Sequence, residues 1–306
     1  MSSLYFSLID FIDQFHSEDD CQDHLFLVKN DDYPYCIKCQ SKRVNRITTR
    51  GYGYYCLDCG YQFSVTKDTV FENTKIPLRK WFLAIYLMTA DKRGISALDL
   101  SRKLSITHPT AMVMLKTLRH LLIDDKRKFI LEGAVEIDEF FIGSSGGTAG
   151  RGTSKAKIII ALSFDLPSIN AFDEEENEDF NPEDDRYAMN LKMTHVDNLT
   201  SETINRFVSE NIHDRAIIIT DSYRGYNKIV DLNFEHVRQS YDPNNQTYHT
   251  LHTIISNFKS FVLGTYHGGF QKDQLQNYLD EFTFRFNHRK ESKLLFDILL
   301  ELCVFR

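Results

Sequence analysis

The pattern of apolar and polar residues in the second half of the chain predicts a sheet with interspersed helices. The segment 134–143, A-V-E-I-D-E-F-F-I-G, is rich in β-branched and aromatic residues and ends in a glycine, which is typical of a strand buried on both faces. Similar short runs predict four more strands, and helical periodicity predicts two helices between them. The strands are expected at 158–164, about 187–195, 216–220 and about 235–238, and the helices at 201–211 and 223–232. This order predicts an α/β fold.

Helical periodicity dominates both ends of the chain. Residues 4–30 predict two short helices, and 249–263 and 274–288 carry apolar residues at three- and four-residue steps. The segment 292–305 predicts a last helix that is apolar enough to dock on the sheet.

The segment 77–122 predicts a DNA-binding region. After a helix at 78–89, a short helix at 96–104, a turn at 105–107 and a helix at 108–122 have helix-turn-helix spacing. Its expected core is Ala97, Leu100, Leu104, Met112, Leu115 and Leu118, and the residues expected to face a DNA groove are His108, Thr110 and Lys116. A three-helix packing unit without DNA contact is the alternative interpretation of this stretch alone.

Four of the six cysteines form two C-x-x-C pairs. Cys36 and Cys39 are separated by sixteen residues from Cys56 and Cys59, so the four thiolates can close a tetrahedron around Zn²⁺. The intervening segment and 61–65 predict the three strands of a zinc ribbon. Basic residues of the intervening hairpin favour DNA phosphates: Lys42, Arg43, Arg46 and Arg50. The alternative is a ribbon that only stabilises the fold or binds protein.

Charge and composition constrain the partners. The net charge of the 306 residues is −7, but the run 173–185 alone holds nine acids and no basic residue, so the rest of the chain carries +2. We expect this run to be a disordered, solvated loop, with an inhibitory or partner-binding role as the alternative. No apolar run is long enough to span a membrane and no signal peptide begins the chain, which points to the cytosol. The expected location is the cytoplasm or nucleoid, or the nucleus if the host is eukaryotic.

Acidic residues interrupt the apolar segments where strands are predicted. Glu136, Asp138 and Glu139 lie within 134–143, and Asp221 directly follows the strand at 216–220. Burying a carboxylate costs several kcal/mol unless it is paired or bound to a cation. For one strand alone, a solvated face of an edge strand would explain the acids. Acids on two strands of one sheet favour a divalent-metal site for phosphoryl chemistry.

Several longer motifs agree with these predictions. They are the ribbon C-I-K-C to C-L-D-C-G-Y-Q-F-S-V, the strand V-E-I-D-E-F-F-I-G, T-D-S-Y-R-G-Y at 220–226, H-T-I-I-S-N-F-K-S-F-V-L-G-T-Y-H-G at 252–268 and Y-L-D-E-F-T-F-R-F-N-H-R at 278–289. In these motifs the chain resembles insertion-sequence transposases of the ISXO-like group. Those proteins place a zinc ribbon and a helix-turn-helix ahead of a ribonuclease-H-like, DDE-type catalytic domain with a mixed sheet flanked by helices.

The resemblance implies a set of catalytic residues. Asp138 and Asp221 match the first two catalytic aspartates, and Lys259 matches a lysine seven residues after the third ligand. Many relatives have Glu or Asn at that third position, where this chain has His252. Imidazole suits Mn²⁺ better than Mg²⁺. Alternatives are a packing or capping role for His252, with Glu281 or Asn257 as the third ligand. Further candidates for DNA contact are Arg224, Arg285 and Arg289.

The resemblance also implies an organisation and an activity. We expect a helical segment at 1–30, a zinc ribbon at 31–72, a helix-turn-helix region at 73–127 and a catalytic domain at 128–306. The implied function is metal-dependent cleavage and transfer of double-stranded DNA at element ends, by a homo-oligomer such as a dimer. The alternatives are a domesticated DNA-binding regulator and a nuclease or resolvase with the same fold.

Overall fold

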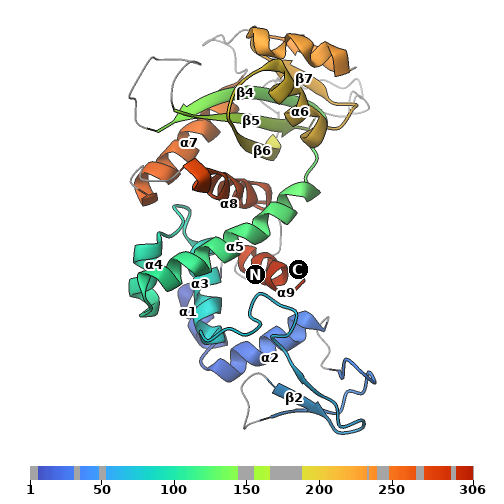
Figure 1. Ribbon diagram of the computed structural model, residues 1–306, viewed down its shortest axis with the longest axis vertical. Helices are drawn as coiled ribbons and strands as arrows, with labels where there is room; N and C mark the ends of the chain where they lie inside the picture. Colours follow the sequence, from blue (N-terminus) through green and yellow to red (C-terminus); the bar gives the residue numbers. More distant parts are fainter. Residues whose placement is uncertain are drawn as a thin grey trace, which may run out of the picture. The chain divides into compact units, whose positions relative to one another are not determined.

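The computed structural model divides the chain into two compact units (Figure 1). Unit 1 contains Met1–Leu122 and Glu291–Arg306, and unit 2 contains Ile123–Lys290. The structure describes residues 6–30, 35–47, 53–143, 155–165, 188–232, 234–239, 248–266, 272–290 and 294–305, with only the backbone described at 124–128, 266 and 272. Arg50 and the acidic run 173–185 therefore lie outside the described residues.

Unit 2 is built on a five-stranded mixed sheet with the order β6-β5-β4-β7-β8. Neighbouring strands are antiparallel from β6 to β4 and parallel from β4 to β8. The strands are β4 (Ala134–Ile142), β5 (Ala156–Phe164), β6 (Ala188–Val196), β7 (Ile217–Thr220) and β8 (Glu235–Arg238). Three antiparallel strands followed by two parallel ones fit the ribonuclease-H-like sheet, so the predicted fold class is confirmed.

Helices cover both faces of this sheet. They are α6 (Ser201–Asn211), the 3₁₀ helix η2 (Arg224–Leu232), α7 (His249–Tyr266), the 3₁₀ helix η3 (Lys272–Gln274) and α8 (Leu275–Asn287). In Figure 1, α7 and α8 lie along one face and α6 along the other. Apolar side chains of β4 and β5 alternate between these two layers, so the sheet has one apolar core with α7 and α8 and another with α6 and η2. This burial explains why β5 reads as a continuous apolar run.

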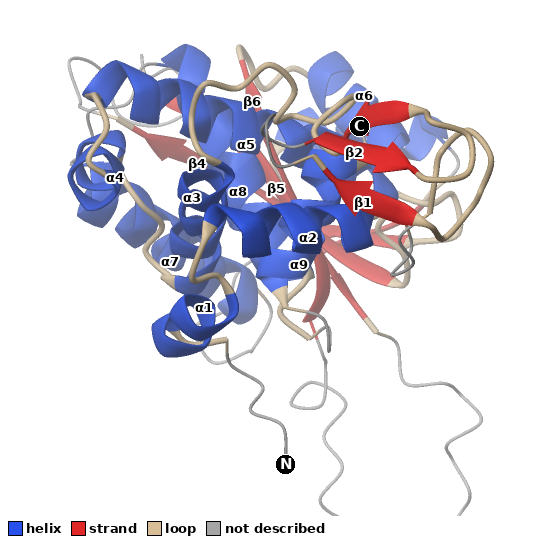
Figure 2. Ribbon diagram, turned by 90° about the horizontal axis from the view of Figure 1, so that it is seen from below, coloured by secondary structure: helices blue, strands red, loops and turns tan. Residues whose placement is uncertain are grey.

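The N-terminal part of unit 1 consists of two helices and a small antiparallel sheet. The helices are α1 (Leu8–Gln14) and α2 (Glu18–Lys29), and the strands are β1 (Val44–Arg46), β2 (Gly53–Cys56) and β3 (Gln62–Ser64). Ser7 and Ser17 each form a capping box at the helix that follows. The ring of Phe26 on α2 stacks on Tyr54 of β2 at 4.3 Å, which fixes the ribbon beside α2 (Figure 2).

Helices α3 (Leu78–Ala90), α4 (Ala97–Leu104) and α5 (His108–Lys128) follow the ribbon. A three-residue turn joins α4 to α5, and Ser105 in this turn has a left-handed backbone with φ of 49°. The buried residues of α5 include Ala111, Met114, Leu115 and Leu118, whereas Met112 is 54% exposed. The assignment of Met112 to the core is therefore wrong, because the buried stripe of α5 is displaced by one residue at its start.

The last helix, α9 (Leu295–Val304), packs within unit 1 and contacts α2 and α3. Phe296 lies against Phe15 and Phe82, and the carbonyl of Cys303 accepts a hydrogen bond from Val70 at 2.9 Å. The expectation that 292–305 docks on the sheet is wrong. An apolar helix face fits either kind of partner, and here aromatic side chains of unit 1 complete the core around it.

In the described part of the chain, none of the helices combines the length and apolar character needed to cross a membrane.

Candidate active site and cysteine cluster

The alternation of β4 separates its acids onto two faces. Ala134, Phe140 and Ile142 belong to the core shared with α7 and α8, so Glu136 and Asp138 point to that face. Val135 and Ile137 belong to the core shared with α6 and η2, so Glu139 points to the other face. Glu136 is 2% exposed and Asp138 is partly exposed. The three acids of one short motif therefore have different surroundings.

Asp138 and Asp221 occupy neighbouring positions on adjacent parallel strands. Ile137 of β4 pairs with Thr220 of β7, and each aspartate is the next residue along its strand direction. Adjacent strands lie about 4.8 Å apart, so the two backbones approach closely at this point. One carboxylate oxygen of each aspartate accepts a local backbone hydrogen bond at 2.8 Å, from Glu139 and from Tyr223 respectively.

Helix α7 places an imidazole on the first of these aspartates. Nε2 of His252 is 3.3 Å from Oδ2 of Asp138. The hydrogen bond to the carboxylate of Asp138 raises the pKa of His252 above its ordinary value of 6.5, although burial opposes this. Lys259, two turns further along α7, holds its ammonium 5.7 Å above the ring of Phe140. The predicted residues of β4 and α7 thus share one face of the sheet.

The alternative third ligands have other surroundings. Glu281 on α8 is fully buried, and its Oε1 is 3.0 Å from Nη2 of Arg285. Asn257 is exposed on α7. Among the described residues, the cysteines form the group of three or more metal-ligating side chains whose ligand atoms all lie within 4.8 Å of one another. The ligand atoms of Asp138, Asp221 and His252 therefore do not all lie within 4.8 Å of one another.

Two buried tyrosines near the acids were not selected from the sequence. The hydroxyl of Tyr226 in η2 donates to Oε2 of Glu139 at 2.6 Å, on the α6 face. Burial raises the pKa of Tyr226 well above its ordinary value, so the phenol remains a donor. Tyr248, directly before α7, donates its backbone N–H to Oε1 of Glu136 at 3.5 Å. Tyr226 belongs to the motif T-D-S-Y-R-G-Y, so this motif could have identified it from the sequence. Tyr248 lies outside the motifs quoted above, so no sequence pattern pointed to it.

The four cysteines converge as their spacing predicts. Their sulfur atoms all lie within 4.8 Å of one another, with 3.6 Å from Cys36 to Cys59 and 3.5 Å from Cys39 to Cys56. Thiolates at about 2.3 Å from a central zinc ion would stand about 3.8 Å apart in a tetrahedron. The arrangement therefore fits a zinc ribbon.

The two cysteine pairs use the same turn. The backbone N–H of Gln40 donates to the carbonyl of Cys36 at 2.8 Å, and that of Gly60 donates to the carbonyl of Cys56 at 2.9 Å. Both residues are left-handed, with φ of 59° and 70°, which explains the glycine in the second turn. The backbone N–H of Cys59 is the main cause that lowers the pKa of Cys56 to about 6, and this favours the thiolate that zinc requires.

Two arginines of the ribbon, Arg43 and Arg46, are paired with acids. Nη1 of Arg43 is 2.6 Å from Oδ1 of Asp58, and Nη1 of Arg46 is 2.6 Å from Oδ1 of Asp19 on α2. Arg43 remains exposed at 68% of its side chain, whereas Arg46 is exposed at 21%. Arg46 thus links the ribbon to α2 in this structure.

Arg285 of α8 and Arg289, which follows this helix, also have partners within unit 2. The side chain of Arg285 is 13% exposed and pairs with Glu281, which does not support its predicted contact with DNA. Arg289 donates to the carbonyl of Met189 at 3.0 Å and stacks on the ring of Phe286 at 3.8 Å. In the helix-turn-helix region, by contrast, the side chains selected for DNA contact lie at the surface. His108 and Lys116 are exposed and Thr110 is half-buried.

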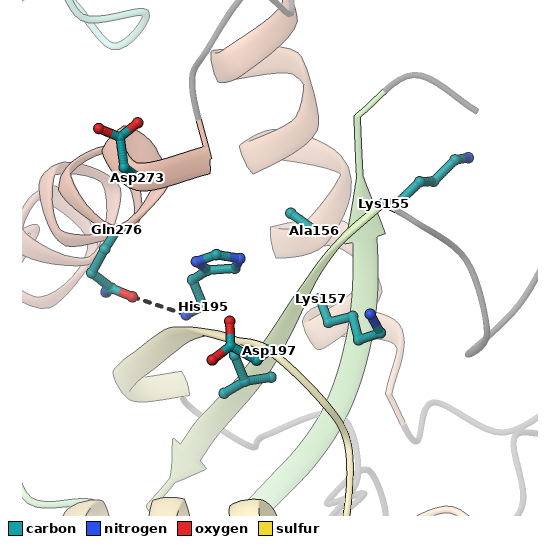
Figure 3. Close-up of a pocket in the computed structure, with 8 residues that line it drawn as sticks. Lys155, Ala156, Lys157, His195, Asp197, Asp273 and Gln276 are labelled. Carbon is teal, nitrogen blue, oxygen red and sulfur yellow. Dashed lines mark hydrogen bonds between the residues drawn. The ribbon is translucent and has the colours of Figure 1, made fainter. Parts of the chain in front are cut away.

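A separate hollow of about 260 Å³ lies beside the start of β5 and the end of β6 (Figure 3). The residues that line it are Lys155, Ala156, Lys157, His195, Val196, Asp197, Asp273 and Gln276. The backbone N–H of His195 donates to Oε1 of Gln276 at 2.8 Å and joins β6 to α8. Lysines and aspartates both line the hollow, and its lining includes none of the predicted catalytic residues.

Comparison with known families settles the class of protein. The family model described as an ISXO2-like transposase domain matches residues 130–287, which is just over half of the chain. The chain belongs to the ISXO2-like transposase family. The match spans β4, β7 and α7, and so includes Asp138, Asp221 and His252. The ISXO2-like assignment confirms the resemblance stated from the sequence motifs and supports a transposase enzyme class.

A relative agrees with the ISXO2-like assignment. A protein of Halobacterium salinarum, described as an uncharacterized protein in the transposable element ISH50, is 36% identical over 124 residues. The alignment covers 38% of this chain and 38% of the relative.

Proposed function

We propose that this transposase cleaves DNA strands at the ends of an insertion sequence and joins them to target DNA, with Asp138, Asp221 and His252 as its DDE-type site. The observation that carries the proposal is the placement of the two aspartates at neighbouring positions of adjacent parallel strands, with the imidazole of His252 3.3 Å from Asp138. The three residues come from segments more than 30 residues apart in sequence.

The donor set suits a divalent cation. Two carboxylates and an imidazole offer oxygen and nitrogen ligands of the kind that Mn²⁺ accepts more readily than Mg²⁺. When bound, such cations neutralise charge on the attacking and leaving oxygens of a phosphodiester. Asp138, Asp221 and His252 would hold them, and Lys259 would bind a phosphate oxygen near the scissile bond. Water would then attack the phosphorus and release a 3′-hydroxyl. That hydroxyl would in turn attack a target phosphodiester, so that a new P–O bond forms and the target strand's 3′-oxygen leaves as a hydroxyl.

The helix-turn-helix region is the part of unit 1 best suited to bind the element ends. Residues 78–122 contain eight basic and two acidic residues, although the whole chain has a net charge of −7. His108 and Lys116 are exposed on α5. The positive balance favours the phosphate backbone of double-stranded DNA. In the ribbon, Arg43 and Arg46 are already paired with acids, so we assign it a smaller share of the binding energy.

Purified Asp138→Asn and Asp221→Asn variants test the catalytic assignment. We expect both to lose Mn²⁺-dependent nicking of element-end DNA by at least about a thousandfold while retaining the wild-type dissociation constant for that DNA. Glu210→Gln, at an exposed position of α6, is the matched control and should nick normally. Nicking by either aspartate variant would refute the site. If the wild-type protein binds element ends but nicks them with no divalent cation, the alternative function, a DNA-binding regulator derived from a transposase, is favoured. His252 in place of a third carboxylate also favours that alternative.

Substitution of Cys56 by Ser tests the ribbon. Bound zinc contributes on the order of 10 kcal/mol to the folding of small zinc modules, so the variant should lose stoichiometric zinc and unfold locally. We expect end binding to weaken while the thermal unfolding of unit 2 is unchanged. The exposed Cys39 offers the matching substitution within the other pair. Normal end binding by a zinc-free variant would show that the ribbon does not help to recognise DNA.

A further inference from the structure

Tyr248 combines three unfavourable features beside the candidate active site. It is 3% exposed, and its hydroxyl is buried without a hydrogen-bond partner among the described residues. Its backbone is left-handed with φ of 61°, which is rare for a bulky aromatic residue. Strain of this kind persists only where the surroundings enforce it, and it clusters at functional sites.

The surroundings of Tyr248 are the proposed metal-binding residues. Its ring lies 6.2 Å from the imidazole of His252, with the two planes 24° apart. Its backbone N–H donates to Glu136, the buried acid two residues before Asp138 on the same face of β4. Burial is the main cause that raises the pKa of the phenol, followed by the charges of Glu136, Asp138 and Asp221, so the hydroxyl stays protonated and able to donate.

We propose that Tyr248 is a positioning residue of the active site. Its ring fixes the plane of the His252 imidazole, and its hydroxyl donates to a neighbouring site carboxylate in the cation-bound protein. This inference rests on the proposed function. It explains why a buried donor without a partner among the described residues is kept near three acids: the donor would fix the orientation of a ligand carboxylate, as outer hydrogen-bond partners do in other metal sites.

The test is Tyr248→Phe, which removes only the oxygen atom. Because the hydroxyl has no hydrogen-bond partner among the described residues, its loss should leave the melting temperature unchanged or raise it by up to about 3 °C. In the same variant, the Mn²⁺ concentration for half-maximal thermal stabilisation should rise about tenfold, and the nicking rate should fall about tenfold or more at an unchanged DNA dissociation constant. A variant that is at least as stable but handles Mn²⁺ poorly supports the inference.

Tyr226→Phe is the matched control on the opposite face of β4. Its hydroxyl has a partner in Glu139, so its removal should lower the melting temperature without changing the Mn²⁺ requirement. If Tyr248→Phe needs the same Mn²⁺ concentration and nicks within about twofold of wild type, Tyr248 only fills space and the inference fails. Because Asp138→Asn would still abolish nicking in that case, the proposed function would survive it.

A second, independent observation concerns the start of α5. Met112 and Val113 are 54% and 63% exposed, next to the exposed Lys116 one turn further on. A pair of apolar side chains in this place lacks the hydrogen-bonding groups with which Arg, Asn or Gln read bases. Apolar side chains in a major groove instead contact the C5-methyl group of thymine. The surplus of basic residues in 78–122 makes DNA, rather than a protein surface, the complementary partner.

We infer that α5 recognises thymine methyl groups in the element ends through Met112 and Val113. This also rests on the proposed function. The experiment selects tight-binding duplexes from a random pool with the wild-type protein and then replaces their thymines by deoxyuridine, which lacks the methyl group. We expect binding to weaken about fivefold or more, and we expect Met112→Ser/Val113→Ser to bind both duplexes alike.

Lys116→Ala is the control for this second inference. The lysine would contact phosphate, so its loss should weaken binding to thymine and deoxyuridine duplexes by the same factor. Equal binding of both duplexes by the wild-type protein would overturn the inference while leaving DNA binding intact. Failure to bind any duplex would overturn the DNA-binding function as well.

Discussion

Asp138 and Glu139 are neighbours in sequence, yet strand alternation places them on opposite faces of β4 with different partners. Glu139 is 9% exposed and receives a 2.6 Å hydrogen bond from the buried hydroxyl of Tyr226. Asp138 stays partly exposed beside His252, and the hydroxyl of the nearby, strained Tyr248 has no such bond within the part of the chain that the structure describes. On the Glu139 face, the acid is part of a buried hydrogen bond that stabilises the fold. On the Asp138 face, the acid belongs to the proposed metal-binding residues. Acidic residues in one motif can therefore serve separate purposes.

The largest expected effect on stability comes from removing the hydrogen bond between Tyr226 and Glu139. Glu139→Ala would leave the Tyr226 hydroxyl buried without its acceptor and open a small cavity, which should cost about 2–4 kcal/mol of unfolding free energy. Chemical denaturation measures this loss, and Glu139→Gln, which keeps an acceptor oxygen, should cost less. Nicking by the folded protein should persist. A stable Glu139→Ala protein without nicking activity would mean that the two faces are not separate.

A smaller effect is expected from Lys259 on the α7 face. If its ammonium binds a phosphate oxygen, Lys259→Ala should slow nicking about tenfold, which corresponds to about 1.4 kcal/mol of transition-state stabilisation. The melting temperature should hardly change, since a single cation–π contact between the half-buried Lys259 and Phe140 contributes little. Lys259→Arg should recover part of the rate. The opposite pattern, lower stability at a normal rate, would make Lys259 a packing residue.

The smallest expected effect concerns the strand beside β7. His236 of β8 lies with Nε2 2.8 Å from Oγ1 of Thr220, and burial is the main cause that lowers its pKa, with Arg238 contributing. Since the unfolded chain then binds the proton more readily, stability should fall as pH drops through the unfolded pKa of about 6.5. Denaturation should show a lower free energy of unfolding at pH 5 than at pH 7, with part of the difference coming from this group. His236→Gln should remove that part of the slope.

Local patterns in the sequence predicted much of this molecule. The spacing of Cys36, Cys39, Cys56 and Cys59 was sufficient for the cysteine cluster, because each pair needs only its own tight turn. The apolar runs around Asp138 and before Asp221 predicted two strands of one sheet. Their side-by-side position then follows from the parallel pairing of β4 with β7.

Features set by tertiary packing were not predictable in this way. A one-residue displacement of the buried stripe moves Met112 to the surface, and a helical pattern does not fix its phase that finely. The pairing of Arg46 with Asp19 joins two segments whose approach the sequence does not encode locally. The Tyr248 hydroxyl is buried without a hydrogen-bond partner among the described residues, and this depends on tertiary packing that the local sequence does not predict.

The return of α9 to unit 1 has a consequence for biosynthesis. Leu295–Val304 follows the whole of unit 2 in the chain but supplies Phe296 and Cys303 to the core around α2 and α3. A ribosome must therefore translate the entire sheet before unit 1 can acquire its final core, and a nascent chain that lacks this helix would emerge with that core incomplete.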